Sequence, residues 1–234
     1  MKAFILAGGL GTRLRSLVSD RPKPMADVNG RPFLHYVIEL LKRQGINDIV
    51  LSVGYMAESI VSYFGDGSRL GVRITYSYEE RPLGTGGALK RAEKLLRDEG
   101  RFLVLNGDTY ILADFRKMLY DAERLNALVY LLVKRGERAQ KSGVIQLDES
   151  SRVVSIRESE SASGYFYAGA SVVSSRIFEL MPEEESFSFE YDLLPRVLHH
   201  GVYALIFDGY IRDIGTPEGY MSFLREVRQV AGEE

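Results

Sequence analysis

Residues 3–14 read Ala3-Phe4-Ile5-Leu6-Ala7-Gly8-Gly9-Leu10-Gly11-Thr12-Arg13-Leu14, a short apolar run that leads straight into a glycine-rich turn. The apolar run predicts a buried strand. Glycines let the backbone turn tightly and bring its N–H groups close to phosphate oxygens. A dinucleotide loop would need a third glycine that is missing after Gly11, and a P-loop would need Gly-Lys-Ser/Thr. A tight turn without a ligand is the alternative interpretation.

Beyond this turn, short apolar runs alternate with longer amphipathic segments, which is typical of βαβ units and a mostly parallel sheet. The pattern predicts strands at 3–6, 49–53, 72–76, 101–105 and 127–133, and helices at 33–44, 57–64, 87–97 and 114–125.

The pattern changes after about Lys134. Strand-like segments follow closely, joined by polar turns at 148–151 and 158–164, which predicts an antiparallel or mixed extension of the sheet. These strands are expected at 143–147, 153–156, 166–173, 203–207 and 210–214, before a last helix at 217–230. We therefore predict an α/β fold, a Rossmann-like three-layer α/β/α arrangement with a mixed, mostly parallel sheet.

The amino-acid composition excludes several classes of protein and several kinds of catalytic chemistry. The chain has 234 residues, 45% hydrophobic and 26% charged, which excludes disordered and fibrous classes. Lys and Arg number 30 against 32 Asp and Glu, so the balance argues against a dedicated nucleic-acid or membrane-surface binder. No cysteine and only 3 His exclude thiol chemistry and disfavour a His-rich metal site. No apolar run approaches the ~20 residues of a spanning helix, and we expect a soluble, cytoplasmic protein.

Two cations lie near the glycine turn. Arg13 is inside it, where a guanidinium can hold a phosphate through two parallel hydrogen bonds. Lys23 stands between Pro22 and Pro24, which fix the backbone on both sides and present the lysine on a stiff segment. An ordinary surface lysine on a rigid loop is the alternative for Lys23.

Two aspartates close predicted strands. Asp108 follows the strand at 101–105 after Asn106-Gly107, and Asp213 ends the strand at 210–214. Ligands of open α/β sheets bind beyond the carboxyl ends of the strands, and Mg²⁺ prefers a few carboxylates together with phosphate oxygens and water. Taken singly, each aspartate is explained by a turn or a helix cap. Together with a phosphate-binding turn they indicate metal-dependent phosphoryl or nucleotidyl transfer.

A second glycine-rich segment, Leu83-Gly84-Thr85-Gly86-Gly87, opens a predicted helix. It is suited to an anion at the helix N-terminus or to a base that approaches the backbone closely. A flexible connection between strand and helix is the alternative.

These segments together resemble the sugar-nucleotide nucleotidyltransferases. The matching pieces occur in family order from residue 8 to residue 217, so the likeness spans nearly the whole chain. They are Gly8-Gly9-Leu10-Gly11-Thr12-Arg13-Leu14, Pro22-Lys23-Pro24, Pro82-Leu83-Gly84-Thr85-Gly86-Gly87, Asn106-Gly107-Asp108 and Asp213-Ile214-Gly215-Thr216-Pro217. Segments 187–190 and 206–210 make the chain most similar to guanylyltransferases that act on D-glycero-α-D-manno-heptose 1-phosphate. Mannose-1-phosphate guanylyltransferases and the uridylyl- and thymidylyltransferases share most of the motifs.

The resemblance implies the nucleotide-diphospho-sugar transferase fold in a single domain over 1–234. Residues 1–133 would bind the nucleotide, and residues 134–234 would bind the sugar and contribute the last helix. It implies a nucleoside triphosphate, GTP first, and a sugar 1-phosphate as substrates, with Mg²⁺ as cofactor. It implies catalytic roles for Arg13, Lys23 and Asp108, and a metal site at Asp108 and Asp213. Nucleotide contacts are implied for Leu6, Ala7, Gly8, Gly9, Gly11, Thr12, Glu79, Gly84, Thr85, Gly86, Asn106 and Gly107.

The motifs specify the identity of the base and of the sugar less closely than they specify the reaction. Glu79 stands where thymidylyltransferases tend to carry a base-reading Gln; a carboxylate only accepts hydrogen bonds, which suits the N1–H and amine of guanine or the imino proton of uracil. Sugar contacts are implied for Gly143, Glu158 and Gly169. Family members often have Glu-Lys where this chain has Glu158-Ser159, so the sugar-phosphate cation would be another residue, with Arg157 and Lys141 as candidates.

Two alternatives stay open. One is a regulatory module that binds a nucleotide without catalysis, which the Ser159 departure favours. The other, a Rossmann oxidoreductase, has the wrong glycine spacing. A homo-oligomer is compatible with the sequence, and neither a nucleic acid nor a membrane is expected as partner.

Overall fold

A computed structural model describes residues 1–9, 21–138, 142–159 and 162–232. The chain forms two compact units that interleave along the sequence. We call Lys2–Pro82, Leu105–Ala113 and Gly209–Glu234 the glycine-turn unit, and Met1, Leu83–Val104 and Asp114–Asp208 the hairpin unit. Each is described by itself.

Three parallel strands form the core of the glycine-turn unit: β1 (Lys2–Leu6), β4 (Asp48–Val53) and β5 (Arg73–Tyr78). β4 pairs with both neighbours, with Phe4 opposite Val50 and Val50 opposite Thr75. α1 (Phe33–Arg43) leads from β1 to β4, and α2 (Ala57–Phe64) leads from β4 to β5. The βαβ units predicted from the alternating pattern are thus confirmed, and α2 has the predicted bounds.

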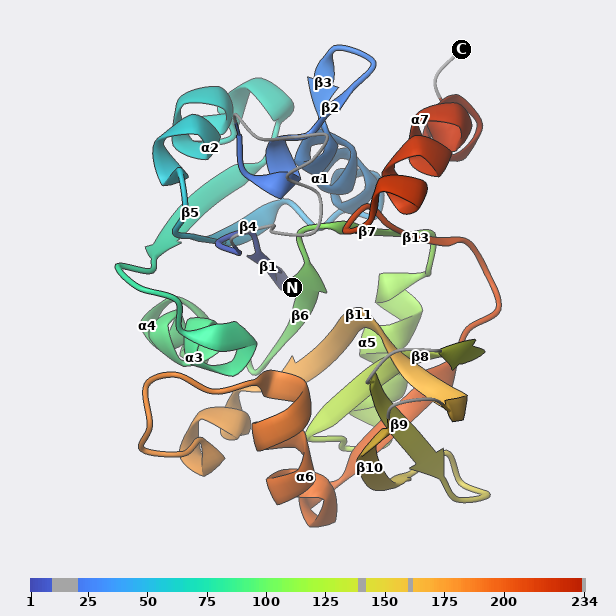
Figure 1. The fold of residues 1–234 in the computed structure, drawn as a ribbon. Helices are drawn as coiled ribbons and strands as arrows, with labels where there is room; N and C mark the ends of the chain where they lie inside the picture. Colours follow the sequence, from blue (N-terminus) through green and yellow to red (C-terminus); the bar gives the residue numbers. More distant parts are fainter. Residues whose placement is uncertain (10–20, 139–141, 160–161, 233–234) are drawn as a thin grey trace. The chain divides into compact units, whose positions relative to one another are not determined.

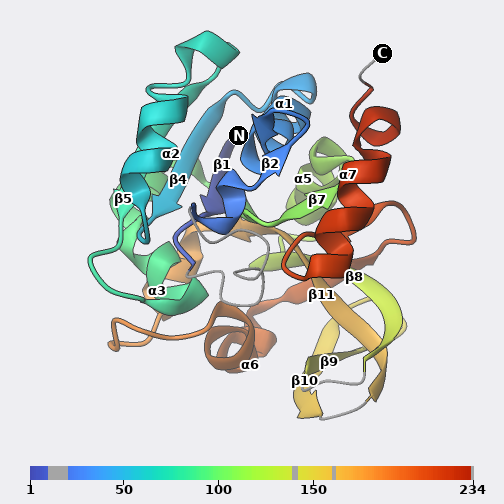
Figure 2. The same cartoon turned by 45° about the horizontal axis from the view of Figure 1, so that its top comes forward.

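The last helix, α7 (Pro217–Ala231), packs within the same unit. Thr216 caps it, because its hydroxyl accepts from the N–H of Gly219 at 3.1 Å, and Pro217 fits the first turn, where its missing N–H costs nothing. The fully buried Phe223 meets Phe33 of α1 edge-on at 4.9 Å between ring centroids, and it meets Tyr110 at 5.2 Å. Both views show α7 beside α1 (Figures 1 and 2).

Short elements complete this unit, and of these the sequence predicts only β13 (Ile211–Asp213), within the strand expected at 210–214. β2 (Asp27–Val28) and β3 (Arg31–Pro32) form a small hairpin, and β7 (Thr109–Ile111) pairs with β13 in an antiparallel ribbon. Two single 3₁₀ turns, η2 (Lys23–Met25) and η3 (Ser68–Leu70), lie between the longer elements.

Strands of both directions build the hairpin unit. β8 (Val129–Arg138) pairs antiparallel with β11 (Ala162–Ser174) and parallel with β12 (Val202–Ile206). β9 (Ser142–Leu147) and β10 (Val153–Ser159) form an antiparallel hairpin, which also joins β11 at the Tyr165–Ile145 pair. The predicted mixed extension is confirmed. The turn predicted at 158–164 is wrong in its bounds, because ladder pairing extends β10 to Ser159 and starts β11 at Ala162.

Helices of the hairpin unit follow the predicted pattern with one break. α5 (Phe115–Arg124) begins after Asp114, whose side chain accepts from the N–H of Lys117 at 2.8 Å. The helix predicted at 87–97 is two, α3 (Gly84–Arg91) and α4 (Glu93–Leu96), followed by η4 (Arg97–Glu99). β6 (Arg101–Asn106) carries the chain from one unit to the other. The remaining helical segments are η5 (Ser175–Leu180), the π-helical η6 (Phe189–Leu193), α6 (Leu194–Val197) and η7 (Leu198–His200).

The fold class predicted from the sequence is confirmed: the sheet is mixed and mostly parallel in its core, with flanking helices. None of the described helices is long and apolar enough to cross a bilayer. The single domain with a boundary after residue 133 stays a prediction, and so does the cytoplasmic location.

Candidate active site

The end of β1 is held by two neighbouring segments of the glycine-turn unit. The N–H of Ala7 donates to the carbonyl of Ser52 at 2.9 Å, and the carbonyl of Leu6 accepts from the N–H of Gly107 at 2.9 Å. A Cβ on Gly107 would stand 2.5 Å from that carbonyl, so only glycine permits this approach. Gly8 and Gly9 follow at the carboxyl end of the strand. Gly11, Thr12 and Arg13 of the predicted site lie outside the described residues.

Glu79 is brought next to Gly8 by the end of β5. Its N–H donates to the carbonyl of Val53 at 2.8 Å, and its Oε1 accepts from the buried hydroxyl of Ser52 at 2.7 Å. A Cβ on Gly8 would lie 2.5 Å from Oε1 of Glu79, so the missing side chain makes room for the carboxylate. Glu79 and the glycine turn, predicted as nucleotide contacts, are therefore neighbours in this unit.

Lys23 and Asp108 form an ion pair although 85 residues separate them along the chain. Nζ of Lys23 lies 2.8 Å from Oδ2 of Asp108, and the two side chains are 11% and 27% exposed. The hydroxyl of Thr109 donates to Oδ1 of Asp108 at 3.2 Å. Prolines 22 and 24 start η2, which presents the lysine as the sequence predicts. Because the pair is partly shielded from water, its attraction is stronger than that of a fully exposed pair.

The β7–β13 ribbon places Asp213 beside the segment that carries Asp108. It lies opposite Thr109 in the ladder, and the N–H of Ile214 donates to the carbonyl of Asp108 at 2.9 Å. Its Oδ1 accepts from the N–H of Gly215 at 2.5 Å. The two aspartates predicted to meet are thus carried on adjoining backbone segments.

A group of three side chains fixes β13 to α7. The hydroxyl of Tyr210 donates to Glu226 at 2.6 Å, and Arg212 contacts both oxygens of that carboxylate, at 3.0 and 2.8 Å. Burial, followed by the bond to Glu226, raises the pKa of Tyr210 to about 12. Bonds from Tyr210 and Arg212 hold the pKa of Glu226 below its usual value. This group orients the strand that ends at Asp213.

The donor set fits Mg²⁺ by its chemistry. Asp108 and Asp213 supply hard carboxylate oxygens, and Mg²⁺ is bound in proteins by one or two carboxylates with substrate phosphates and water in the remaining positions. Clusters of three or more His, Cys, Asp or Glu suited to a metal are absent from the described part of the chain. A two-carboxylate site that the substrate completes is the arrangement these residues allow.

The glycines at the start of α3 hold another segment of the hairpin unit. The N–H groups of Gly86 and Gly87 donate to the carbonyl of Phe187 at 3.0 and 3.2 Å, and the hydroxyl of Thr85 accepts from the N–H of Phe189 at 2.8 Å. Gly84 has φ +70° and leaves 2.6 Å between a hypothetical Cβ and the same carbonyl. The glycines at the start of α3 therefore allow this helix to pack closely against the segment at Phe187. Gly84 and Thr85 remain exposed, whereas Gly86 is buried.

The residues predicted for the sugar lie in the hairpin unit. Gly143 of β9 pairs with Glu158 of β10, and a Cβ on Gly143 would stand 2.7 Å from Oε1 of Glu190. Gly169, with φ +89°, lies at the irregularity in the β8–β11 ladder between Tyr167 and Ser171. Gly143 and Glu158 are thus brought together.

Tyr167 and Glu190 also belong to this region, although the sequence does not single them out as sugar contacts. The hydroxyl groups of Tyr167 and Ser171 are 3.3 Å apart, and the rings of Tyr167 and Phe189 are 6.3 Å apart. Burial raises the pKa of Tyr167 well above its ordinary value, and the charge of Glu190 adds to this shift. Ser52 is the corresponding omission in the other unit. A lone serine in a strand carries no signal in one sequence, whereas Glu190 falls in segment 187–190, which the family likeness had already singled out.

A family model described as nucleotidyl transferase matches residues 2–230. The chain belongs to the nucleotidyl transferase family. A D-glycero-alpha-D-manno-heptose 1-phosphate guanylyltransferase of Aneurinibacillus thermoaerophilus is 40% identical over 230 residues, which cover 97% of this chain and 99% of the relative. A mannose-1-phosphate guanylyltransferase of Mycobacterium tuberculosis is 35% identical over 94% of this chain and 62% of its own length.

The fold of this nucleotidyl transferase is also found in solved structures. The crystal structure of HddC from Yersinia pseudotuberculosis, described as complexed with GMP-PN, superimposes with a TM-score of 0.79 and 34% identity. The similarity covers 97% of this chain and 99% of that one. The resemblance inferred from the motifs is confirmed at the level of the family.

Proposed function

We propose that this nucleotidyl transferase transfers GMP from GTP to D-glycero-α-D-manno-heptose 1-phosphate. An oxygen of the sugar phosphate attacks the α-phosphorus of GTP, the bond from that phosphorus to the bridging oxygen of the β-phosphate breaks, and pyrophosphate leaves. The products are a GDP-sugar and pyrophosphate. Near-full-length similarity to a heptose 1-phosphate guanylyltransferase supports this substrate pair.

The observation that carries the proposal is the Lys23–Asp108 ion pair with Asp213 on the adjoining strand. Nucleotidyl transfer requires little covalent chemistry from the protein, so catalysis depends on positioning the reactants and neutralising charge. In this proposal Lys23 bridges the reacting phosphates and exchanges its contact with Asp108 for one with a phosphate oxygen. Arg13 neutralises charge on the leaving pyrophosphate.

Asp108 and Asp213 would hold Mg²⁺, which polarises phosphoryl oxygens when bound. The ladder between β7 and β13 keeps the two carboxylates on adjoining segments before substrate binds. Tyr210, Arg212 and Glu226 keep β13 in place, so the acidic pair needs little rearrangement.

Glu79 is proposed to read the base. Ser52 orients one oxygen of its carboxylate, and Gly8 leaves space beside it. A carboxylate with fixed orientation can accept from both the N1–H and the exocyclic amine of guanine. Glu158, Gly143 and Gly169 are proposed to contact the sugar, and the neighbouring Glu190 adds an acceptor for its hydroxyl groups.

Pyrophosphate release tests base and sugar together. The full chain is incubated with Mg²⁺, each of the four nucleoside triphosphates, and heptose, mannose or glucose 1-phosphate in turn. The proposal predicts the highest kcat/KM for GTP with heptose 1-phosphate. A preference for mannose 1-phosphate or for UTP would refute the proposed substrate specificity. It would still support nucleotidyl transfer to a sugar 1-phosphate. Nucleotide binding without pyrophosphate from any pair would favour the regulatory module and refute the enzymatic proposal.

A further inference from the structure

A basic cavity of about 920 Å³ opens on the glycine-turn unit, away from the proposed transfer site. It is bordered by the β2–β3 hairpin, the second half of α1, η3 and the end of α7. The residues that line it are Asn29, Arg31, Glu39, Lys42, Arg43, Arg69, Leu70, Arg228, Ala231 and Gly232.

The position of this basic cavity separates it from the strand ends that carry Gly8 and Glu79. Lys42 and Arg43 end α1 just before β4 begins at Asp48, and Arg69 precedes the start of β5. These residues therefore lie toward the edge at which the parallel strands start. Gly8 and Glu79 follow the carboxyl ends of β1 and β5, where ligands of such sheets normally bind.

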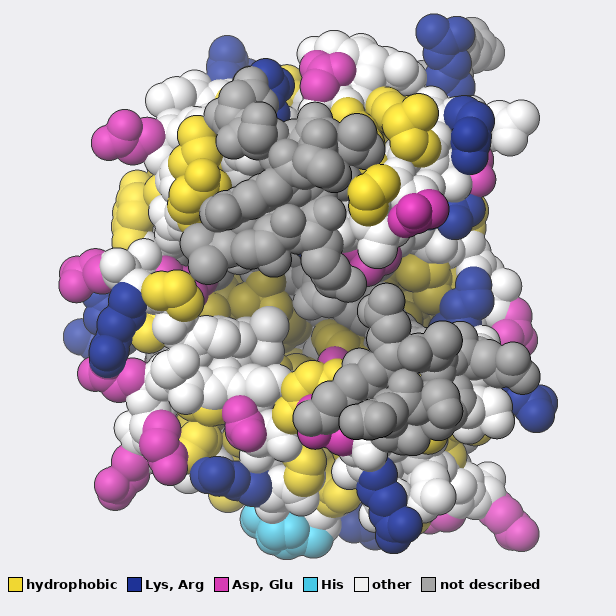
Figure 3. Space-filling view, viewed as in Figure 1, with side chains coloured by type: hydrophobic (Ala, Val, Ile, Leu, Met, Phe, Trp, Pro, Cys, Tyr) yellow, Lys and Arg dark blue, Asp and Glu magenta, His cyan; other side chains and the backbone are white. Residues whose placement is uncertain are grey.

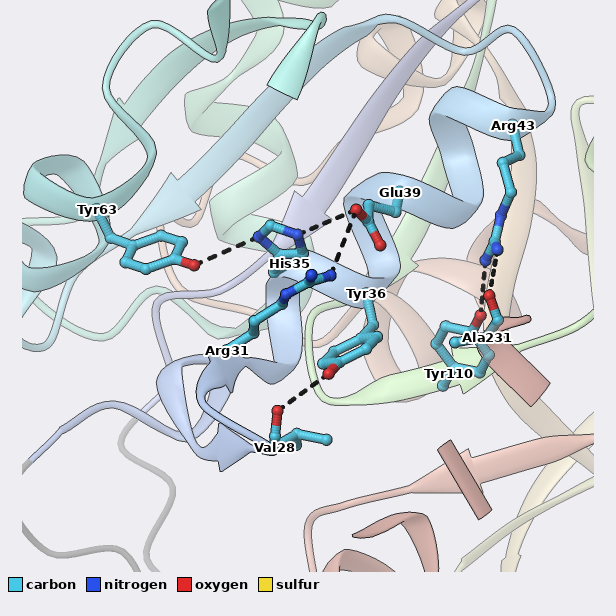
Figure 4. A network of polar contacts seen from close by, with 9 residues as sticks. All are labelled: Val28, Arg31, His35, Tyr36, Glu39, Arg43, Tyr63, Tyr110 and Ala231. Carbon is cyan, nitrogen blue, oxygen red and sulfur yellow. Dashed lines mark hydrogen bonds and ion pairs between the residues drawn. The ribbon is translucent and has the colours of Figure 1, made fainter. Parts of the chain in front are cut away.

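Positive charge dominates the lining of the basic cavity, with five Lys or Arg side chains and one Glu. Glu39 is already engaged: Nε2 of His35 lies 3.1 Å from its Oε1, and the guanidinium of Arg31 lies 3.8 Å away (Figure 4). The hydroxyl of Tyr63 meets the other ring nitrogen of His35 at 3.4 Å. Among the described residues that line the cavity, this one carboxylate is outnumbered by five cations, so most of their positive charge is not compensated within the lining.

The side chains of two of these cations, Lys42 and Arg228, are available to bind a ligand. Within the described part of the chain, the side chains of Lys42 and Arg228 have neither a hydrogen-bond nor an ion-pair partner. Arg43 is oriented by the carbonyl of Ala231 and by the hydroxyl of Tyr110 at 3.2 Å (Figure 4). The space-filling view shows Lys and Arg side chains around the end of α7 (Figure 3). Mutual repulsion of these cations is relieved when an anion enters.

The lining also indicates the chemistry of the ligand. Guanidinium groups match phosphate oxygens through paired hydrogen bonds, and ammonium groups bind phosphate as point charges. The apolar lining consists of Leu70 and Ala231, and the described lining residues include no aromatic ring on which a base would stack. We propose that the basic cavity binds a small soluble ligand with two or more phosphate groups, recognised through its charge.

Titration calorimetry of the full chain with inorganic tripolyphosphate at low ionic strength tests this proposal. Arg228→Gln should weaken binding about tenfold, the effect of one lost charged hydrogen bond. Arg225→Gln, an exposed residue on the same helix outside the lining, removes the same charge and should change binding less than about twofold. Glucose 1,6-bisphosphate, used as a second probe, distinguishes separated from adjacent phosphates, and binding of either probe with this Arg228 dependence supports the proposal.

Three results would overturn it. Equal losses in Arg228→Gln and Arg225→Gln would mean general attraction of anions. If neither probe binds, the cavity is not a site for ligands with two or more phosphate groups. Binding only after removal of Glu233 and Glu234, which follow Gly232 in the sequence, would mean that the chain's own carboxylates occupy the cations. Thermal unfolding of each variant without ligand verifies that it is folded, and a ligand-dependent rise in midpoint reports binding without reference to activity.

Discussion

Replacement of Glu79 by Gln gives the sharpest test of how the base is read. The carboxylate, oriented by Ser52 at 2.7 Å, offers only acceptors. Guanine presents two donors side by side, its N1–H and its exocyclic amine. Gln keeps the size of the side chain but replaces one acceptor by an NH₂ group. One hydrogen bond to guanine is lost, and two donors then face each other.

The expected magnitude follows from the hydrogen bonds involved. A hydrogen bond to a charged group contributes about 1.5–3 kcal/mol, and a tenfold change in rate corresponds to about 1.4 kcal/mol. Glu79→Gln should therefore lower kcat/KM for GTP by about ten- to a hundredfold. ITP lacks the exocyclic amine, so the oxygen of Gln can still accept its single N1–H, and its kcat/KM should fall by less.

The assay is pyrophosphate release with GTP and with ITP, for wild type, Glu79→Gln and Glu80→Gln. Glu80 is the exposed neighbour, so its replacement makes the same charge change outside the proposed contact. Wild type and Glu80→Gln should prefer GTP to ITP, and Glu79→Gln should lose most of that preference. An unchanged GTP-to-ITP ratio in Glu79→Gln would refute base reading by this residue, even if both rates fell.

Three further predictions concern stability. Phe223→Ala should lower the free energy of unfolding by about 3–5 kcal/mol, because the ring is fully buried between α1 and β7; in urea titration the exposed Met221→Ala is the control, and a loss as small as the control's would contradict the packing. Gly87→Ala should cost about 1–3 kcal/mol, because its Cβ would overlap the carbonyl of Glu185, an effect larger than the gain in helix propensity; unchanged stability by urea titration would refute that close approach. Tyr210 has a folded pKa of about 12 against an ordinary value of 10, so the native state keeps a proton that the unfolded chain releases, and unfolding free energy falls as pH rises from 10 to 12. Tyr210→Phe should make the unfolding free energy depend less steeply on pH in urea titrations across this range. A slope equal to that of wild type would show that Tyr210 is not responsible for it.

Most of the longer helices and strands could be predicted because each has a local signal. α2 has the predicted bounds, and α1 ends within one residue of the prediction, since their apolar spacing is supported by flanking prolines or glycines. β2, β3 and β7 have two or three residues each, too few for any periodicity. β8 runs five residues past its apolar part because its ladder with β11 continues.

The candidate site was predictable as residue types but not as contacts. Lys23 and Asp108 meet across 85 residues, and Asp213 joins them through a ribbon that forms only in the folded chain. The glycines of α3 illustrate a limit of the sequence. Close approach of a ligand and close approach of another chain segment both require glycine. A Cβ on Gly86 would overlap the ring of Phe187, and a Cβ on Gly87 would overlap the carbonyl of Glu185.

The rate of pyrophosphate release by Asp108→Asn, compared with Asp114→Asn, tests the central claim most directly. Asparagine keeps the shape of aspartate but removes the charge that pairs with Lys23. Asp114 caps α5, and asparagine caps helices equally well, so the control should retain nearly full activity. With GTP, heptose 1-phosphate and Mg²⁺, Asp108→Asn should lose about a thousandfold in turnover while its urea midpoint shows a folded protein. Turnover close to that of wild type in Asp108→Asn would contradict the claim that this carboxylate belongs to the transfer site.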